Sequence, residues 1–220
     1  MIGKEIHKFA SELWPFNRSL TGEGVRETLY KISEYLPNLV IKSVPSQTKV
    51  FDWTVPQEWA VREAYIITPS GKKICNFSKN NLHLLGYSIP FSGELTFGEL
   101  KEHLYTLPEQ PEAIPYVTSY YEKQWGFSLS QKQFNSLEDG MYKVLIDTKL
   151  FDGELNYAEL LIPGKSEKEI FLSTYICHPS MANNELSGPT VTTFLAKWLT
   201  AINELEYSYR IIFIPETIGS

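Results

Sequence analysis

The sequence predicts an α/β fold with a smaller, mainly β domain inserted into it, and three observations support this assignment. Residues 169–176 and 208–215 are apolar runs rich in β-branched and aromatic residues, as in buried strands. Between them, apolar residues recur at helical spacing after the S-G-P at 187–189, where proline suits a first helical turn. A strand, a crossover helix and a second strand almost oblige a parallel pair.

Two amphipathic helices are predicted at the start of the chain. Apolar side chains lie at helical spacing in residues 2–14 and again in residues 25–36, with a break at residues 21–24. Both stripes are one-sided, so we expect the two helices to pack on the sheet of the α/β domain.

The middle of the chain has a different texture, which predicts the inserted domain. Short strand-like runs separated by turn residues begin near residue 46, and residues 107–115 hold three prolines that favour an extended loop. We assign 1–45 and 140–220 to the α/β domain and 46–139 to the β-rich insertion. The expected elements are strands at 49–55, 62–68 and 72–77, a helix at 96–105, weak helical periodicity at 131–137, and strands at 141–147 and 154–162.

His178 and Glu216 both follow a predicted strand. Ligands of open α/β sheets bind beyond the carboxyl ends of the strands, and neighbouring strands are about 4.8 Å apart, so both side chains can reach one metal or one water. Neutral imidazole is a common zinc ligand, and a carboxylate can accept a proton from zinc-bound water. The pattern therefore suggests hydrolysis at a metal site. A lone histidine at a strand end is more often structural, and that alternative stays open here.

Longer motifs carry a resemblance that covers nearly the whole chain. They include C-H-P-S-M-A-N-N-E-L-S-G-P at 177–189, P-E-T-I-G-S at 215–220, R-S-L-T-G-E-G-V-R-E-T-L at 18–29 and G-Y-S-I-P-F-S-G at 86–93. L-P-E-Q-P-E-A-I-P-Y-V-T-S-Y-Y at 107–121 and W-G-F-S-L-S at 125–130 belong to the same set. The chain resembles a bacterial family of uncharacterised aminopeptidase-like proteins, distantly related to di-zinc aminopeptidases and glutamate carboxypeptidase. The resemblance implies a partial zinc-exopeptidase-like (phosphorylase/hydrolase-like) sheet with helices.

The resemblance also implies roles for individual residues. His178 matches a strand-end zinc ligand, whereas the acidic residue that usually follows two positions later is Ser180 here. The metal-bridging Asp of D-N-x-S-G falls on Asn184, a weak bridge because an amide carries no charge, and Glu185 offers a carboxylate one position later. Glu216 matches the general base, without the second carboxylate that usually stands beside it. We expect one zinc ion and leave a second open for a full-length form.

Two functions remain in competition. One is a zinc-dependent metallo-aminopeptidase-like hydrolase acting on a small peptide or amide substrate, with a link to polysaccharide biosynthesis implied by the family. The other is a non-catalytic binding or scaffold module that keeps the peptidase fold. Such peptidase domains normally continue with further strands and ligands, so we expect this 220-residue chain to be a fragment with an incomplete site.

Composition excludes several partners. A net charge of −6 with no basic cluster argues against nucleic acid and anionic membranes, and no apolar run is long enough to span a bilayer. The two cysteines are far apart and no signal peptide is evident, so we expect a reducing, cytoplasmic location. The sequence leaves a homo-oligomer open.

Other candidate residues favour structural explanations. His83 lies on an apolar stretch, where a hydrogen-bonded core histidine is commoner than a ligand, and His103 is expected on the surface of a helix. The aromatic residues of the insertion are best explained by core packing, with a sugar- or peptide-binding shelf as the alternative. Ser180 and Ser187 lack the G-x-S-x-G context of a serine nucleophile.

Overall fold

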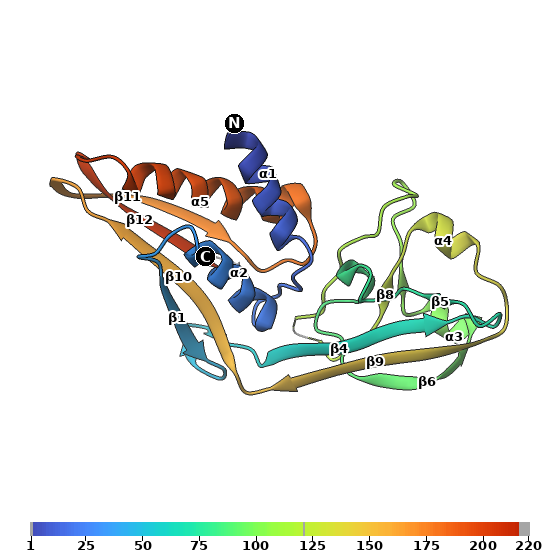
Figure 1. The fold of residues 1–220 in the computed structure, drawn as a ribbon. Helices are drawn as coiled ribbons and strands as arrows, with labels where there is room; N and C mark the ends of the chain where they lie inside the picture. Colours follow the sequence, from blue (N-terminus) through green and yellow to red (C-terminus); the bar gives the residue numbers. More distant parts are fainter. Residues whose placement is uncertain (1, 121, 216–220) are drawn as a thin grey trace. The chain divides into compact units, whose positions relative to one another are not determined.

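The computed structural model describes residues 2–120 and 122–215 (Figure 1). Its contacts divide the chain into two compact units. The first consists of Met1–Glu58 with Phe151–Ser220, and the second of Trp59–Leu150. The predicted insertion, 46–139, covers much of the second unit, and its independence as a domain stays a prediction.

A four-stranded sheet forms the centre of the first unit. Its strand order is β1 (Val40–Pro45), β10 (Glu154–Ile162), β12 (Tyr207–Ile214) and β11 (Ser166–Tyr175). β11 and β12 are parallel, as the strand, helix, strand pattern predicted, while β1 with β10 and β10 with β12 are antiparallel. The sheet is therefore mixed.

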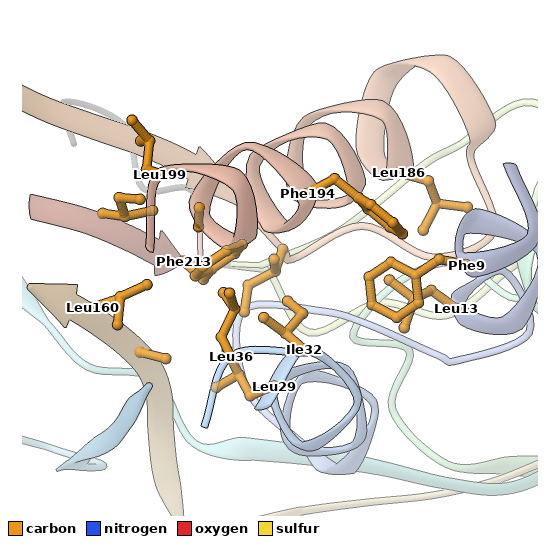
Figure 2. Packing of buried hydrophobic residues seen from close by; sticks show 14 of the residues in the cluster. Phe9, Leu13, Leu29, Ile32, Leu36, Leu160, Leu186, Phe194, Leu199 and Phe213 are labelled. Carbon is orange, nitrogen blue, oxygen red and sulfur yellow. The ribbon is translucent and has the colours of Figure 1, made fainter. Parts of the chain in front are cut away.

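Three helices cover one face of this sheet: α1 (Ile2–Leu13), α2 (Glu23–Ser33) and α5 (Ser187–Thr200) (Figure 1). Their apolar stripes meet the inward side chains of β10 and β12 in a single core (Figure 2). The expectation that the two N-terminal helices pack on the sheet is confirmed. The core residues labelled in Figure 2 are Phe9, Leu13, Leu29, Ile32, Leu36, Leu160, Leu186, Phe194, Leu199 and Phe213.

The connection from β11 to α5 positions the candidate site. The chain leaves β11 at Tyr175, passes through residues 176–181 and makes one π-helical turn, η2 (Ala182–Leu186), before α5 begins. Gly188 allows α5 to start close to the strand, because a Cβ there would lie 2.5 Å from Thr174 Oγ1. His178 thus lies beyond the carboxyl end of a parallel strand.

A second four-stranded sheet belongs mainly to the second unit. Its order is β5 (Lys73–Ile74), β4 (Glu58–Ile67), β9 (Met141–Phe151) and β6 (Phe91–Thr96). Short elements complete this part of the chain: η1 (Asn81–His83), α3 (Phe97–Lys101), β7 (Leu104–Tyr105), β8 (Phe127–Ser128) and α4 (Gln131–Asn135). Trp59, Tyr87 and Trp125 are buried, with Trp59 stacked on Tyr87, so core packing accounts for these aromatics.

Several predicted elements differ in detail. The strand expected at 49–55 is a small hairpin of β2 (Lys49–Val50) and β3 (Trp53–Thr54), which are joined by a turn at Phe51 with a positive φ of 54°. The run at 72–77 supplies only the two residues of β5, because Cys75 adopts a positive φ of 46°. The helix expected at 96–105 ends at Lys101. His103 is half-buried and stacks on Trp125 rather than lying on a helix surface.

No helix among the described residues has the length and apolar character that crossing a membrane requires.

The second unit predicts a simple excision test. A fragment covering residues 59–150 should fold alone and unfold cooperatively in urea, because it contains its own sheet and its own buried side chains. The measurement is circular dichroism during urea titration, and a matched fragment with Tyr142→Ala, which removes a fully buried ring, should unfold at lower urea. A fragment without a cooperative transition would show that this region depends on the rest of the chain.

Candidate active site

Three potential metal-binding side chains converge after β11. Cys177, His178 and Glu185 each place one donor atom within 4.8 Å of the others. His178 Nδ1 lies 3.0 Å from Glu185 Oε2 and 3.4 Å from Cys177 Sγ. The Glu185 carboxylate is fully buried, while the His178 side chain keeps 12% of its surface exposed. An imidazole at a protein surface is thus held by a carboxylate in the interior.

A buried arginine stands behind the carboxylate. The Arg18 side chain has no exposed surface, and its Nε lies 3.3 Å from Glu185 Oε1. Burial lowers the pKa of the Arg18 guanidinium from its usual value, and the charge of Glu185 opposes that shift. Arginine remains charged in proteins, so Glu185 is the counter-ion that this buried cation requires.

Arg18 also ties the N-terminal segment to the histidine loop. Its Nε donates to the His178 carbonyl at 3.0 Å and its Nη1 donates to the Leu13 carbonyl at 2.6 Å. Ser180 adds a second link, since its hydroxyl donates to the Trp14 carbonyl at 2.7 Å. The segment after α1 and the loop after β11 are therefore fixed against each other.

Gly24 makes the position of Arg18 possible. A Cβ on Gly24 would overlap the Asn17 carbonyl and come within 2.8 Å of the Arg18 backbone nitrogen. Gly24 of the R-S-L-T-G-E-G motif thus allows two segments of the chain to pack closely.

The structure brings together only some of the site residues predicted from the sequence. His178 and Glu185 meet, whereas Asn184 is exposed and its carbonyl accepts a hydrogen bond from the Tyr175 hydroxyl at 2.7 Å. Glu216 lies outside the described residues. The π-helical turn explains the contrast between neighbours, because it directs Glu185 inward and leaves Asn184 in solvent.

Two members of the cluster were missed by sequence reasoning. Cys177 was treated only as a cysteine without a partner cysteine nearby, although its position next to His178 was a signal for a donor pair. Arg18 stands at the start of the motif at 18–29 quoted above, but its pairing with Glu185 connects segments far apart in sequence. No local pattern announces such a contact.

The donor set fits zinc. Imidazole, thiolate and carboxylate are the three side-chain ligand types of protein zinc sites, and a donor atom of each type lies within 4.8 Å of the others here.

Comparison with known proteins assigns the family. A family model described as "Domain of unknown function (DUF4910)" matches residues 7–220. The chain belongs to this family. A protein of Clostridium acetobutylicum named "Putative polysaccharide biosynthesis protein with aminopeptidase-like domain" is 50% identical over 218 residues, which are 99% of this chain and 50% of that protein. This DUF4910 chain thus spans about half the length of the curated relative.

Similar solved structures show which fold the chain has. A crystal structure of a C. acetobutylicum protein described as a "putative peptidase" matches with a TM-score of 0.95 at 50% identity, over 99% of this chain and 51% of that one. A zinc aminopeptidase from Bacillus subtilis matches with a TM-score of 0.57 at 12% identity, over 96% and 60%. An M28 peptidase precursor from Shewanella amazonensis gives 0.55 at 10% identity, over 96% and 66%. The DUF4910 chain has the fold of zinc aminopeptidases, and its predicted family resemblance and fold class are confirmed.

The buried ion pair predicts a stability effect. Arg18→Met should lower the free energy of unfolding by about 3–5 kcal/mol, because Glu185 would be left buried without its cation. Arg18→Met combined with Glu185→Leu should recover much of the loss, since neither charge remains. The control is Lys165→Met, which breaks an exposed pair with Glu204 and should cost less than about 1 kcal/mol. Additive effects of the two substitutions in urea denaturation would contradict the coupling.

Proposed function

We propose that this chain is the metal-binding part of a zinc-dependent aminopeptidase-like hydrolase that cleaves a peptide or amide bond. One observation carries the proposal: an imidazole bound by a buried carboxylate lies beyond the carboxyl end of a parallel strand, on the fold of zinc aminopeptidases. The name of the 50%-identical relative mentions an aminopeptidase-like domain, which supports hydrolysis of a peptide or amide bond.

Three residues have separate roles in the proposed hydrolysis. His178 supplies the imidazole ligand, and Glu185 completes the cluster behind it. Zinc, when bound, would polarise the scissile carbonyl and lower the pKa of a coordinated water. Glu216, placed one residue after Pro215 at the end of the β12 segment, is proposed to accept the proton of that water.

We propose one zinc per chain. Asn184, which the sequence suggested as a further ligand, presents an uncharged amide from an exposed position, which favours a single ion over a bridged pair. A second ion remains open for the full-length protein, because the relatives are about twice as long as this chain.

The substrate is proposed to be a small peptide or an amide, with a sugar-linked amide suggested by the polysaccharide-biosynthesis name of the relative. We also propose a cytoplasmic location, because the two cysteines of the sequence lie far apart. The alternative function is a scaffold module that keeps the fold without catalysis. The exposed Asn184 favours it, since a catalytic two-metal bridge would need a carboxylate there.

Zinc content distinguishes a ligand from a structural histidine. His178→Ala should lower zinc occupancy of the purified full-length protein by a large factor, because a ligand is lost. His7→Ala is the matched control, since it removes an exposed imidazole from α1 of the same unit and should leave zinc unchanged. The measurement is metal analysis after equilibration with zinc. Equal occupancy in the two variants would remove His178 from the site.

A test of Glu216 separates an enzyme from a scaffold. Glu216→Gln in the full-length protein should reduce hydrolysis of aminoacyl amides by about 100-fold or more, since a positioned proton acceptor is lost, while zinc content stays the same. Glu204→Gln, at an exposed residue paired with Lys165, should leave turnover unchanged. Equal turnover in wild type and Glu216→Gln would end the general-base assignment, and no turnover in any form would favour the scaffold.

A further inference from the structure

We infer that Glu185 is a positioning residue, held by Arg18, that orients the His178 imidazole and does not itself bind the metal. The sequence suggested Glu185 as a ligand, so this inference deepens the proposed function and rests on it. The carboxylate would fix the tautomer of His178, and a metal would take Nε2 of the ring.

Both oxygens of the carboxylate already face a partner. Oε2 lies 3.0 Å from His178 Nδ1, and Oε1 lies 3.3 Å from Arg18 Nε. The contact with Arg18 is electrostatic, because the Arg18 Nε–H is donated to the His178 carbonyl. Oε1 accepts no hydrogen bond, but a divalent cation that approached it would meet the positive charge of Arg18 at short range.

The charge of Arg18 also argues against Glu185 as a metal ligand. The guanidinium is fully buried, and Glu185 is the acidic group that offsets its charge most strongly. A carboxylate that also bound a divalent cation would have to share its single negative charge between two cations. The penalty for burying Arg18 would then be compensated less well. The geometry therefore favours Glu185 as counter-ion and hydrogen-bond acceptor.

Glu185 is better placed than two neighbouring polar residues to orient the His178 imidazole. Ser180, two positions after His178, uses its hydroxyl on the Trp14 carbonyl. Asn184 is exposed on the solvent side of the π-helical turn. Glu185, fully buried in that turn, is within hydrogen-bond distance of the ring.

The contact between Glu185 and His178 Nδ1 selects the ring nitrogen that is left for a metal. An acceptor at 3.0 Å from Nδ1 places the proton of the neutral ring on that nitrogen, and the metal then binds the opposite nitrogen. A carboxylate behind a metal-bound histidine also raises the basicity of the ligand, and its loss typically costs about 10–100-fold in metal affinity.

The test is nitrogen NMR of histidine-labelled protein, in which only four histidines contribute signals. In the metal-free 220-residue chain, long-range proton–nitrogen correlations should show His178 protonated at Nδ1, with its signals assigned by their loss in His178→Ala. Arg18→Met with Glu185→Leu removes the carboxylate without stranding a buried cation and should abolish this preference. Arg18→Met with Glu185→Gln, which keeps an amide acceptor, should retain part of it.

Zinc titration of the full-length protein completes the test. Zinc should shift the Nε2 resonance of His178 while Nδ1 remains protonated, and the doubly substituted Met and Leu variant should bind zinc about 10–100-fold more weakly in chelator competition. Protonation of wild-type His178 at Nε2, or zinc bound to Nδ1, would overturn the inference. An Nδ1–H tautomer in a protein that binds no zinc would overturn the zinc-hydrolase proposal and leave the Glu185–His178 interaction standing.

Discussion

The buried positive charge of Arg18 is the constraint on which the structure around the candidate site depends. Arg18 has no contact with solvent, so its guanidinium needs a carboxylate in the interior, and Glu185 provides it. Because the other oxygen of that carboxylate faces His178, the electrostatic requirement of the fold also fixes the imidazole at the strand end. The same arginine donates to the backbone of α1 and of the histidine loop, which joins the start of the chain to the candidate site.

The sequence predicted the parts of this arrangement that depend on local patterns. Apolar runs and helical spacing identified α1, α2, β11, α5 and β12, and the strand-end rule singled out His178. The pairing of Arg18 with the histidine loop joins residues 160 positions apart, and no periodicity encodes it. The choice between Asn184 and Glu185 depends on a π-helical turn, whose extra residue per turn cannot be recognised from residue types alone.

In the rest of the chain, too, local patterns predicted the long elements, whereas features that depend on tertiary contacts were not predicted. Long strands such as β9 and β10 were found from their composition, while two-residue strands such as β5 and β7 exist only through their partners. The strand predicted at 72–77 ends early, at Cys75, where the backbone turns with a positive φ. Family membership shows the fold, whereas the role of each residue at the site rests on the contacts of this chain.

The proposed chemistry depends on His178 as a metal ligand whose imidazole is oriented by Glu185. Anomalous diffraction at the zinc absorption edge, from crystals of the full-length protein grown with zinc, locates the ion independently of any assay. The account predicts a zinc peak at bonding distance, about 2.0–2.1 Å, from His178 Nε2, with both Glu185 oxygens still facing Arg18 and Nδ1. A zinc ion bonded to a Glu185 oxygen, or a peak remote from His178, would contradict it.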